Sequence, residues 1–353
     1  MYKGKVFYGQ DAFEGLALME ELMGHRQPDA VARAYPEADS EAEKGTERPA
    51  ALQRRGEVPA AAFTFTERSE TPPAAHIPTP PFWGSRVVES VDLRRIFPYV
   101  NEIALFRGQW QFKRGNMQAD EYDEFLNEEV RPLFQHWQDR CIKEGILEPR
   151  VVYGYFPCQS SGNDLIVYRI PKQNTPDLKT LERSHLEEWV RFTFPRQLSD
   201  RRLCLADFFR SIDSNEYDVA AFQLVTMGGR ATELEQAYFR DNAYRDYLYL
   251  HGLSVETAEA LAEYWHQQVR RELHIDQDDS TDIRQIYAQH YQGSRYSFGY
   301  PACPRLEDEE QIFELLRPDR IGVVLSEEYQ LHPEQSTSAM VVHHPDAKYF
   351  NIR

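Results

Sequence analysis

The stretch RVVYGYFPCQSSGNDLIVYRI, residues 150–170, decides the fold class of this chain. Its valines, isoleucines and aromatic residues form two strand-like runs, 150–157 and 164–170, and no helical stretch separates them. Elsewhere, long helical stretches interrupt the strand-like runs without a regular alternation of strand and helix. The sequence therefore predicts an α+β fold, with a twisted antiparallel sheet flanked by helices.

Apolar periodicity predicts the remaining elements of this domain. Helices are expected at 92–105, 118–144, 179–190, 204–213, 231–250, 254–273 and 307–317. Further strands are expected at 191–195, 219–226, 320–326, 338–343 and 348–352.

The chain divides into three regions. Residues 1–25 contain one short strand-like run and one stretch of helical spacing, which cannot bury their own faces, so we expect the end of a larger α/β unit. Residues 26–78 are rich in alanine, glutamate, arginine and proline without a persistent period, and are expected to form a linker. Residues 79–353 are expected to form a single domain.

Composition narrows the function classes. Forty basic and 57 acidic side chains give a formal net charge of -17, which disfavours binding to nucleic acids and to anionic membranes. Such a surface suits a partner with a complementary positive patch. The four cysteines form no CxxC pair, which argues against a zinc site and suits a reducing compartment. No signal peptide and no apolar run of about 20 residues is present, so a cytoplasmic protein is expected.

The strongest local signal for a binding site is RYSFGYPACP, residues 295–304. Its glycine permits close approach of the backbone to a ligand, and its prolines hold an irregular loop in one shape. Arg295 could form a forked pair with a carboxylate, and the exposed backbone groups could read the edge of an adenine. A rigid structural loop with a surface arginine explains the residues equally well.

The segment HHPDAKYF, residues 343–350, raises a metal hypothesis and an aromatic one. Adjacent residues on a strand point to opposite faces, so His343 and His344 cannot readily share one ion, and a structural role is favoured. Tyr349 and Phe350 could form aromatic walls around a purine or a sulfonium, although core packing explains both as well.

Three acidic residues have both a structural and a functional interpretation. Asp92 directly precedes a helical stretch, where capping is its favoured role and binding of a ligand ammonium or ribose hydroxyl is the alternative. Glu259 and Glu263 lie one helical turn apart, where a solvated face is the default. No dinucleotide-binding glycine motif, P-loop, HExxH or nucleophile elbow occurs, which favours a module that positions a reactive cofactor.

Residues from about 71 to the C-terminus resemble the C-terminal activation domain of cobalamin-dependent methionine synthase. The resemblance rests on many ordered stretches, among them TPPFWGSRVV (79–88), LFRGQWQF (105–112), RYSFGYPACP (295–304) and HHPDAKYF (343–350). The motif R-x-x-x-G-Y-P-x-C-P is highly specific to this family. Residues 1–25 resemble the last strand and helix of the family's cobalamin module, without its cobalamin-ligating motif.

The resemblance implies a binding site for S-adenosylmethionine. By analogy, Asp92 would hold the ammonium group of the ligand and Arg295 its carboxylate, with Tyr300 and Ala302 in the same binding segment. Tyr349 and Phe350 would form the aromatic pair, although Phe350 lacks the hydroxyl that the family often has there. Glu259 would be a helix glutamate near the site.

The implied function is reactivation of methionine synthase. S-adenosylmethionine and an electron, typically from flavodoxin, would convert inactive cob(II)alamin to methylcobalamin. The cobalamin would be held by a partner module, because this chain lacks the folate and homocysteine modules and the cobalamin motif. The alternative is a non-catalytic docking domain for flavodoxin or for the cobalamin module.

Overall fold

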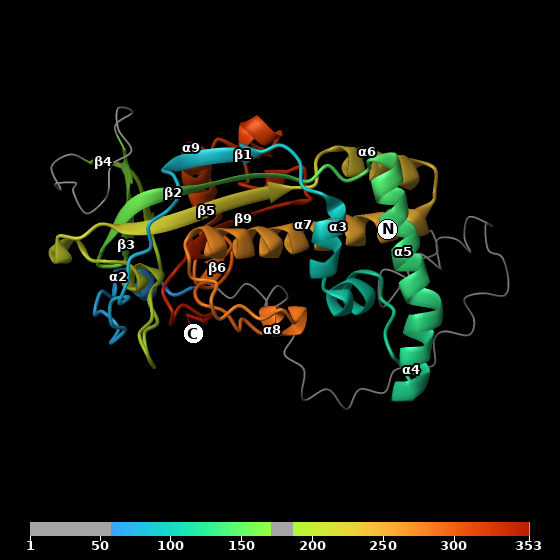
Figure 1. The fold of residues 1–353 in the computed structure, drawn as a ribbon, viewed down its shortest axis with the longest axis horizontal. Coiled ribbons are helices and arrows are strands. Elements are labelled where there is room, and N and C mark those ends of the chain that lie inside the picture. The colour runs from blue at the N-terminus through green and yellow to red at the C-terminus, as the bar shows by residue number, and fades with distance from the viewer. Residues whose placement is uncertain (1–57, 171–185, 353) are drawn as a thin grey trace, which may run out of the picture.

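The computed structural model describes residues 58–170 and 186–352 of the chain. The expected strand and helix of residues 1–25, and residues 26–57 of the expected linker, lie outside this part. The described residues confirm the α+β prediction: a sheet lies at the centre and helices pack on both of its faces (Figure 1).

The sheet has seven strands, and every pairing in it is antiparallel. Its order is β4-β3-β2-β5-β9-β6, and β1 pairs with β2 as well. The strands are β1 (Gly84–Val88), β2 (Arg150–Ser161), β3 (Asp164–Arg169), β4 (Glu187–Thr193), β5 (Asp218–Thr226), β6 (Ser294–Tyr296) and β9 (Ser336–Val342). A separate pair joins β7 (Val324–Leu325) to β8 (Leu331–His332).

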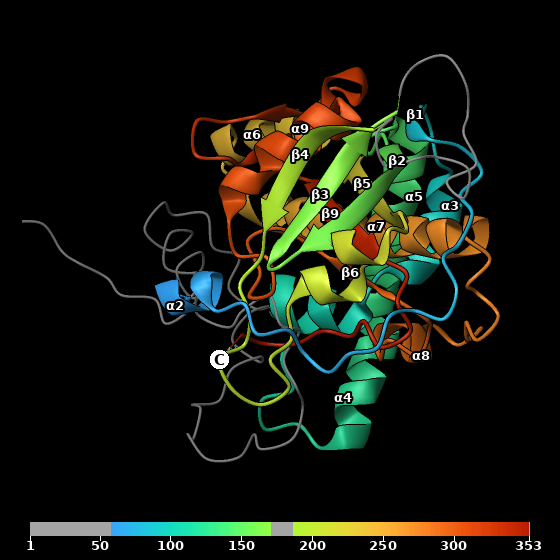
Figure 2. The same ribbon diagram turned by 90° about the vertical axis from the view of Figure 1, so that its left-hand side faces the viewer.

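Strand β2 is buried on both faces, which explains its nearly unbroken run of apolar residues. Tyr153 and Tyr155 point into the hydrophobic cluster that also contains residues of α7 (Tyr244–Glu272). Val152 and Phe156 point into the cluster on the other face, which includes α9 (Glu309–Leu316). Figure 2 shows α9 lying along this second face beside β4.

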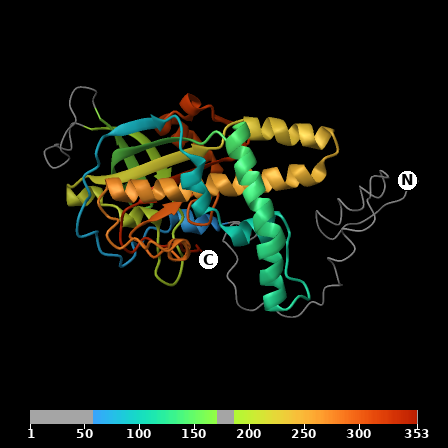
Figure 3. The same cartoon turned by 45° about the vertical axis from the view of Figure 1, so that its right-hand side comes forward.

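Further helices extend the layer that contains α7: α3 (Leu93–Ile96), α4 (Ala119–Phe125), α5 (Arg131–Glu144), α6 (Arg230–Arg240) and α8 (Ile283–Tyr287). The short helix α2 (Ala60–Thr64) instead contributes Ala62 to the cluster on the other face of the sheet. A π-helical turn spans Ala104–Gln109. Figures 1 and 3 show α4 and α5 as a column that crosses the direction of α7.

The expected break between helices at 250–254 is wrong, because α7 runs through it without interruption. Gly252 lies in the middle of this helix, and a Cβ there would come within 2.7 Å of Gln109 and 3.1 Å of Trp110. The glycine therefore permits close packing of the π-helical turn on α7. The chain breaks earlier, at Asn242, which has a positive φ of 59°.

Four other element predictions fail for local reasons. The helix expected at 204–213 is two short 3-10 turns, Leu205–Phe208 and Ile212–Ser214. The described end of the helix expected at 179–190 belongs to strand β4. No strand forms at 348–352, and only Val324–Leu325 of the strand expected at 320–326 is extended in a sheet.

Residues 58–78, the C-terminal part of the expected linker, contact the rest of the domain. Ala62 is fully buried, and Pro72 accepts a hydrogen bond from His344 Nε2 at 2.8 Å. Arg68 donates to the backbone oxygen of Asp207 at 2.9 Å. In the part of the chain that the structure describes, no helix is both long and apolar enough to cross a bilayer.

Candidate ligand-binding site

A cavity of about 470 Å³ opens between α7, β6 and the loop that follows β6. The π-helical turn, α8 and the segment near the C-terminus complete its walls. Its lining residues are Tyr99, Asn101, Ala104, Gln109, Val255, Glu256, Glu259, Ala260, Glu263, Ile286, Tyr287, Gln289, Tyr291, Arg295, Tyr296, Ser297, Tyr300, Ala302, Cys303 and Tyr349.

Helix α7 contributes three carboxylates to this cavity, from Glu256, Glu259 and Glu263. Spacings of three and four residues place them along one side of the helix, while Leu261 packs into the core. The solvated face expected for Glu259 and Glu263 is wrong for Glu263, which is only 8% exposed. The wall formed by α7 is therefore strongly acidic.

Arg295 is the only cation among the described residues that line the cavity. Its Nη2 donates to Glu259 Oε2 at 3.1 Å and its Nε donates to Glu263 Oε2 at 3.3 Å. Burial alone would lower the pKa of Arg295, but the two carboxylates raise it above its ordinary value. The guanidinium is therefore charged and fixed in orientation.

A buried charge network lies behind Arg295. Burial alone would raise the pKa of Glu263, but His266, Arg295 and Arg270 lower it to about 2. Burial and the charge of Arg270 lower the pKa of His266 to about 4, so this histidine is neutral at neutral pH. Arg270 in turn pairs with Asp279 at 2.8 Å. The network keeps Glu263 ionised and holds it against Arg295.

The loop after β6 is closed by its own backbone. Gly299 N donates to Cys303 O at 2.9 Å, and Cys303 N donates to Tyr300 O at 2.9 Å. Gly299 has φ 87°, a conformation that favours glycine. This turn brings Tyr300 and Ala302, two of the residues that the resemblance assigns to the binding segment, to the cavity wall.

The aromatic pair near the C-terminus is divided between cavity and core. Tyr349 lines the cavity and is 36% exposed, so it lies at the mouth. Phe350 is 8% exposed and packs edge-on against Phe208 and Tyr296. Only the first residue of the predicted pair is therefore in contact with the cavity.

Asp92 lies outside the cavity lining and caps helix α3. Its Oδ1 accepts a hydrogen bond from Arg94 N at 3.0 Å, and the two side chains form an exposed ion pair at 3.6 Å. The structure thus gives Asp92 the capping role that the sequence favoured, and does not bring it together with Arg295.

Sequence reasoning missed several residues of the cavity. Asn101 lines it, while its Oδ1 accepts from Ile103 N and Ala104 N at 3.1 and 3.2 Å. Glu256 lines it three residues before Glu259. The helical spacing from Glu259 was the one feature of the sequence that could have indicated Glu256 as a cavity residue. Asn101 reaches the cavity only through the fold of the chain.

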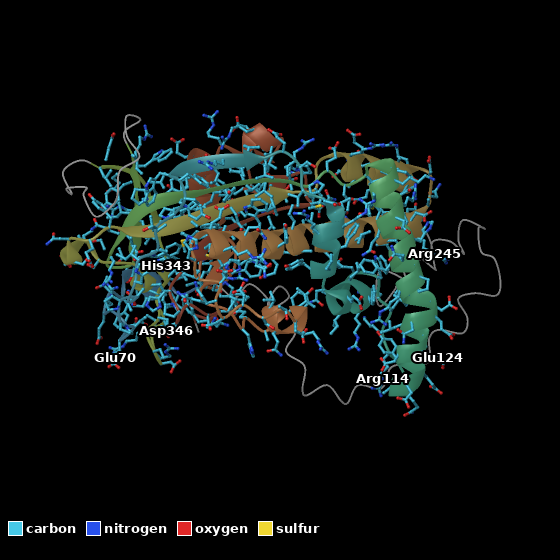
Figure 4. All side chains as sticks on the ribbon, in the orientation of Figure 1. Glu70, Arg114, Glu124, Arg245, His343 and Asp346 are labelled. Atoms are coloured by element: carbon cyan, nitrogen blue, oxygen red, sulfur yellow. The ribbon has the colours of Figure 1, made fainter. Side chains whose placement is uncertain are left out.

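The paired histidines contact different partners. His343 Nε2 lies 2.7 Å from Asp218 Oδ1 inside the domain, whereas His344 Nε2 donates to Pro72 O. Figure 4 shows His343 among packed side chains and Asp346 nearer the periphery. Among the described residues, no group of three or more histidine, cysteine, aspartate or glutamate side chains is placed to hold a metal ion.

A second cavity, of about 1130 Å³, is bordered by residues of β1, β3, β4 and α9. Glu314 is the only carboxylate among its described lining residues, whereas four arginines line it. Those arginines are Arg86, Arg169, Arg317 and Arg320. Arg169 pairs with Glu314 at 3.8 Å and Arg317 with Asp319 at 3.1 Å, whereas Arg86 and Arg320 form no ion pair with the described residues.

Comparison with known proteins gives one consistent family. Residues 92–353 match the family model described as the activation domain of vitamin B12 dependent methionine synthase. Methionine synthases of Mycobacterium tuberculosis and Mycobacterium leprae are each 43% identical to the chain, over 100% of it and 30% of their own length. A crystal structure of the MetH reactivation domain bound to AdoHcy is similar with a TM-score of 0.67 and 26% identity, over 78% of this chain and 83% of that one.

Proposed function

This chain belongs to the family of vitamin B12 dependent methionine synthase activation domains, and on that premise we propose that it binds S-adenosylmethionine in the cavity between α7 and β6. The bound ligand would present its methyl group for reductive reactivation of cobalamin. One observation carries the proposal. The cavity brings together Glu259, Arg295, Tyr300, Ala302 and Tyr349, which come from three segments far apart in the sequence.

The chemistry of the lining fits this ligand. Arg295, fixed by two glutamates, has donors for the carboxylate of the methionine part. The negative face of a tyrosine ring attracts a sulfonium cation. The negative charge of a carboxylate does so as well. The small side chain of Ala302 and the closed turn after Gly299 leave backbone groups near the cavity for an adenine. The structure related to this chain holds AdoHcy, the product of methyl transfer.

The residues of this chain orient the methyl group for transfer. Cobalamin, held by a neighbouring module, would supply the cobalt that accepts the methyl after a one-electron reduction. Transfer breaks the bond between sulfur and methyl carbon and leaves S-adenosylhomocysteine. Placing the methyl group in line and excluding water is the contribution expected of the protein.

We propose two partners within methionine biosynthesis. The cobalamin module would cover the cavity mouth, where the lining residues Tyr287 and Tyr349 are 37% and 36% exposed. An acidic electron donor such as flavodoxin would be attracted by the arginines of the second cavity. We place the protein in the cytoplasm, because its four cysteines are buried free thiols.

Calorimetric titration with S-adenosylmethionine tests the proposal. The chain should bind the ligand, and Arg295→Ala should weaken binding by about 100-fold, since a charge-assisted pair contributes about 1.5–3 kcal/mol. Circular dichroism and thermal unfolding of the variant check that it is folded. A folded parent chain that binds no S-adenosylmethionine would contradict the proposal and favour a docking domain without a ligand.

A further inference from the structure

The three glutamates of the cavity differ in how their charges are balanced. Glu259 and Glu263 share Arg295, and Glu263 also lies 3.8 Å from Arg270. Glu256 accepts only an amide hydrogen bond, from Gln109 Nε2 at 3.2 Å. Among the described residues no lysine, arginine or histidine forms an ion pair with Glu256. The cavity therefore contains one carboxylate whose charge no protein group neutralises.

The position of Glu256 matches the part of the ligand that still needs a partner. The aspartate first expected to hold the ammonium group, Asp92, caps α3 outside the cavity. The side chain that contacts Glu256, Gln109, is a neutral amide, and so is Asn101 elsewhere in the lining. A cationic group bound on this side of the cavity would have Glu256 as its nearest uncommitted carboxylate.

The spacing on α7 allows an amino acid to be held by both ends. Glu256 and Glu259 are three residues apart, so their Cβ atoms lie about 5–6 Å from each other on the helix surface. Arg295 uses Nε and Nη2 for its glutamates, and its Nη1 makes no hydrogen bond with the described residues. An amino acid whose carboxylate binds Nη1 would then direct the ammonium group on the same carbon toward Glu256.

We propose that Glu256 is the residue that recognises the α-ammonium group of the bound ligand, and thereby selects an amino acid rather than a simple acid. This inference rests on the proposed function, since it assigns a role within the same cavity. It also accounts for an otherwise unbalanced charge, because the ligand brings a net positive charge to a lining with three carboxylates and one arginine.

The experiment compares three ligands on the parent chain and on Glu256→Gln at pH 7.5. The ligands are S-adenosylmethionine, S-adenosylhomocysteine, and the analogue of S-adenosylhomocysteine that lacks only the amino group. The variant should bind the first two about 10-fold or more weakly, and the deaminated analogue with unchanged affinity. The preference of the parent chain for the amino compound should disappear in the variant.

A matched control and the contrary outcomes separate the possible roles of Glu256. Glu233→Gln removes the same charge from an exposed position on α6 and should change none of the affinities. Weakening of S-adenosylmethionine alone would assign Glu256 to the sulfonium, and equal weakening of all three would make its role structural. Either result, or no change at all, would overturn the proposal. If the parent chain binds none of the three, the proposed function itself fails.

Discussion

At the scale of single residues, the cavity combines fixed charges with one adjustable charge. Arg295 and Glu263 are held in their ionised forms by each other and by Arg270. Glu256 differs, because burial and, less strongly, the nearby Glu259 raise its pKa to about 7, although the hydrogen bond from the Gln109 amide opposes this. A ligand cation is the missing group that would stabilise the ionised form of Glu256.

Burial of the ionised Glu256 carboxylate is unfavourable, and this predicts that the stability of the fold depends on pH. Because the pKa of Glu256 is raised by folding, its neutral form stabilises the folded state below pH 4.5, and this contribution is lost as the pH rises to about 7. Without ligand, the free energy of unfolding of Glu256→Gln should therefore equal that of the parent chain near pH 4.5. At pH 8 it should be larger by on the order of 1 kcal/mol, allowing for solvent screening. Thermal unfolding at both pH values measures this, and equal differences at the two would contradict it.

Residue identity alone could not separate Asp92 from the true cavity residues. Asp92 and Glu256 are both acidic residues with ordinary structural roles in the sequence. Their assignment depends on which side of a helix reaches the cavity, and this depends on contacts between residues far apart in the chain. Arg295, Tyr300 and Ala302 were predictable because one compact motif carries them.

At the scale of elements, the long helix α7 forms the acidic wall of the cavity. The π-helical turn, which forms another part of the wall, packs closely against α7. Strands β2 and β5 were predictable because alternate residues are buried on opposite faces, which leaves an apolar run. Strand β6 was missed because three residues are too few to show a period. The false break near Gly252 arose because a packing glycine has the same sequence signal as a helix end.

The packing at Gly252 gives a prediction for the element. Gly252→Ala would place a Cβ against Gln109 and Trp110, forcing the π-helical turn away from α7. We expect a loss of about 1–3 kcal/mol of stability together with weaker S-adenosylmethionine binding, since Gln109 and Asn101 line the cavity. Gly229→Ala is the control, because its added Cβ meets no atom within 4 Å and its φ of -83° suits alanine. Similar effects of the two variants in unfolding and titration experiments would contradict this view of α7.

At the scale of the whole molecule, the distribution of charge bears on the acidic redox partner that we propose for this acidic chain. The net charge of -17 would repel flavodoxin, yet four arginines gather around the second cavity. Arg86 lies 3.8 Å above the ring of Phe82 and pairs with no carboxylate among the described residues. Such a local patch can guide a negatively charged partner despite the overall charge.

Reversing one charge of this patch tests the partner. Arg86→Glu should weaken binding of flavodoxin about 10-fold at low ionic strength, and added salt should reduce the difference between variant and parent. Arg240→Glu, exposed at the end of α6 outside the cavity, is the matched control. If Arg86→Glu and the parent chain bind flavodoxin with equal affinity in titrations at low salt, flavodoxin does not bind at this patch.

The central claim is that the cavity between α7 and β6 is the binding site for S-adenosylmethionine, and a crystal structure of the chain with S-adenosylhomocysteine tests it most directly. We predict that the ligand lies in this cavity, with its carboxylate on Arg295, its amino group facing Glu256 and its adenine beside the turn of Tyr300 to Cys303. A ligand bound outside this cavity, or one that leaves Arg295 in contact only with Glu259 and Glu263, would contradict the account.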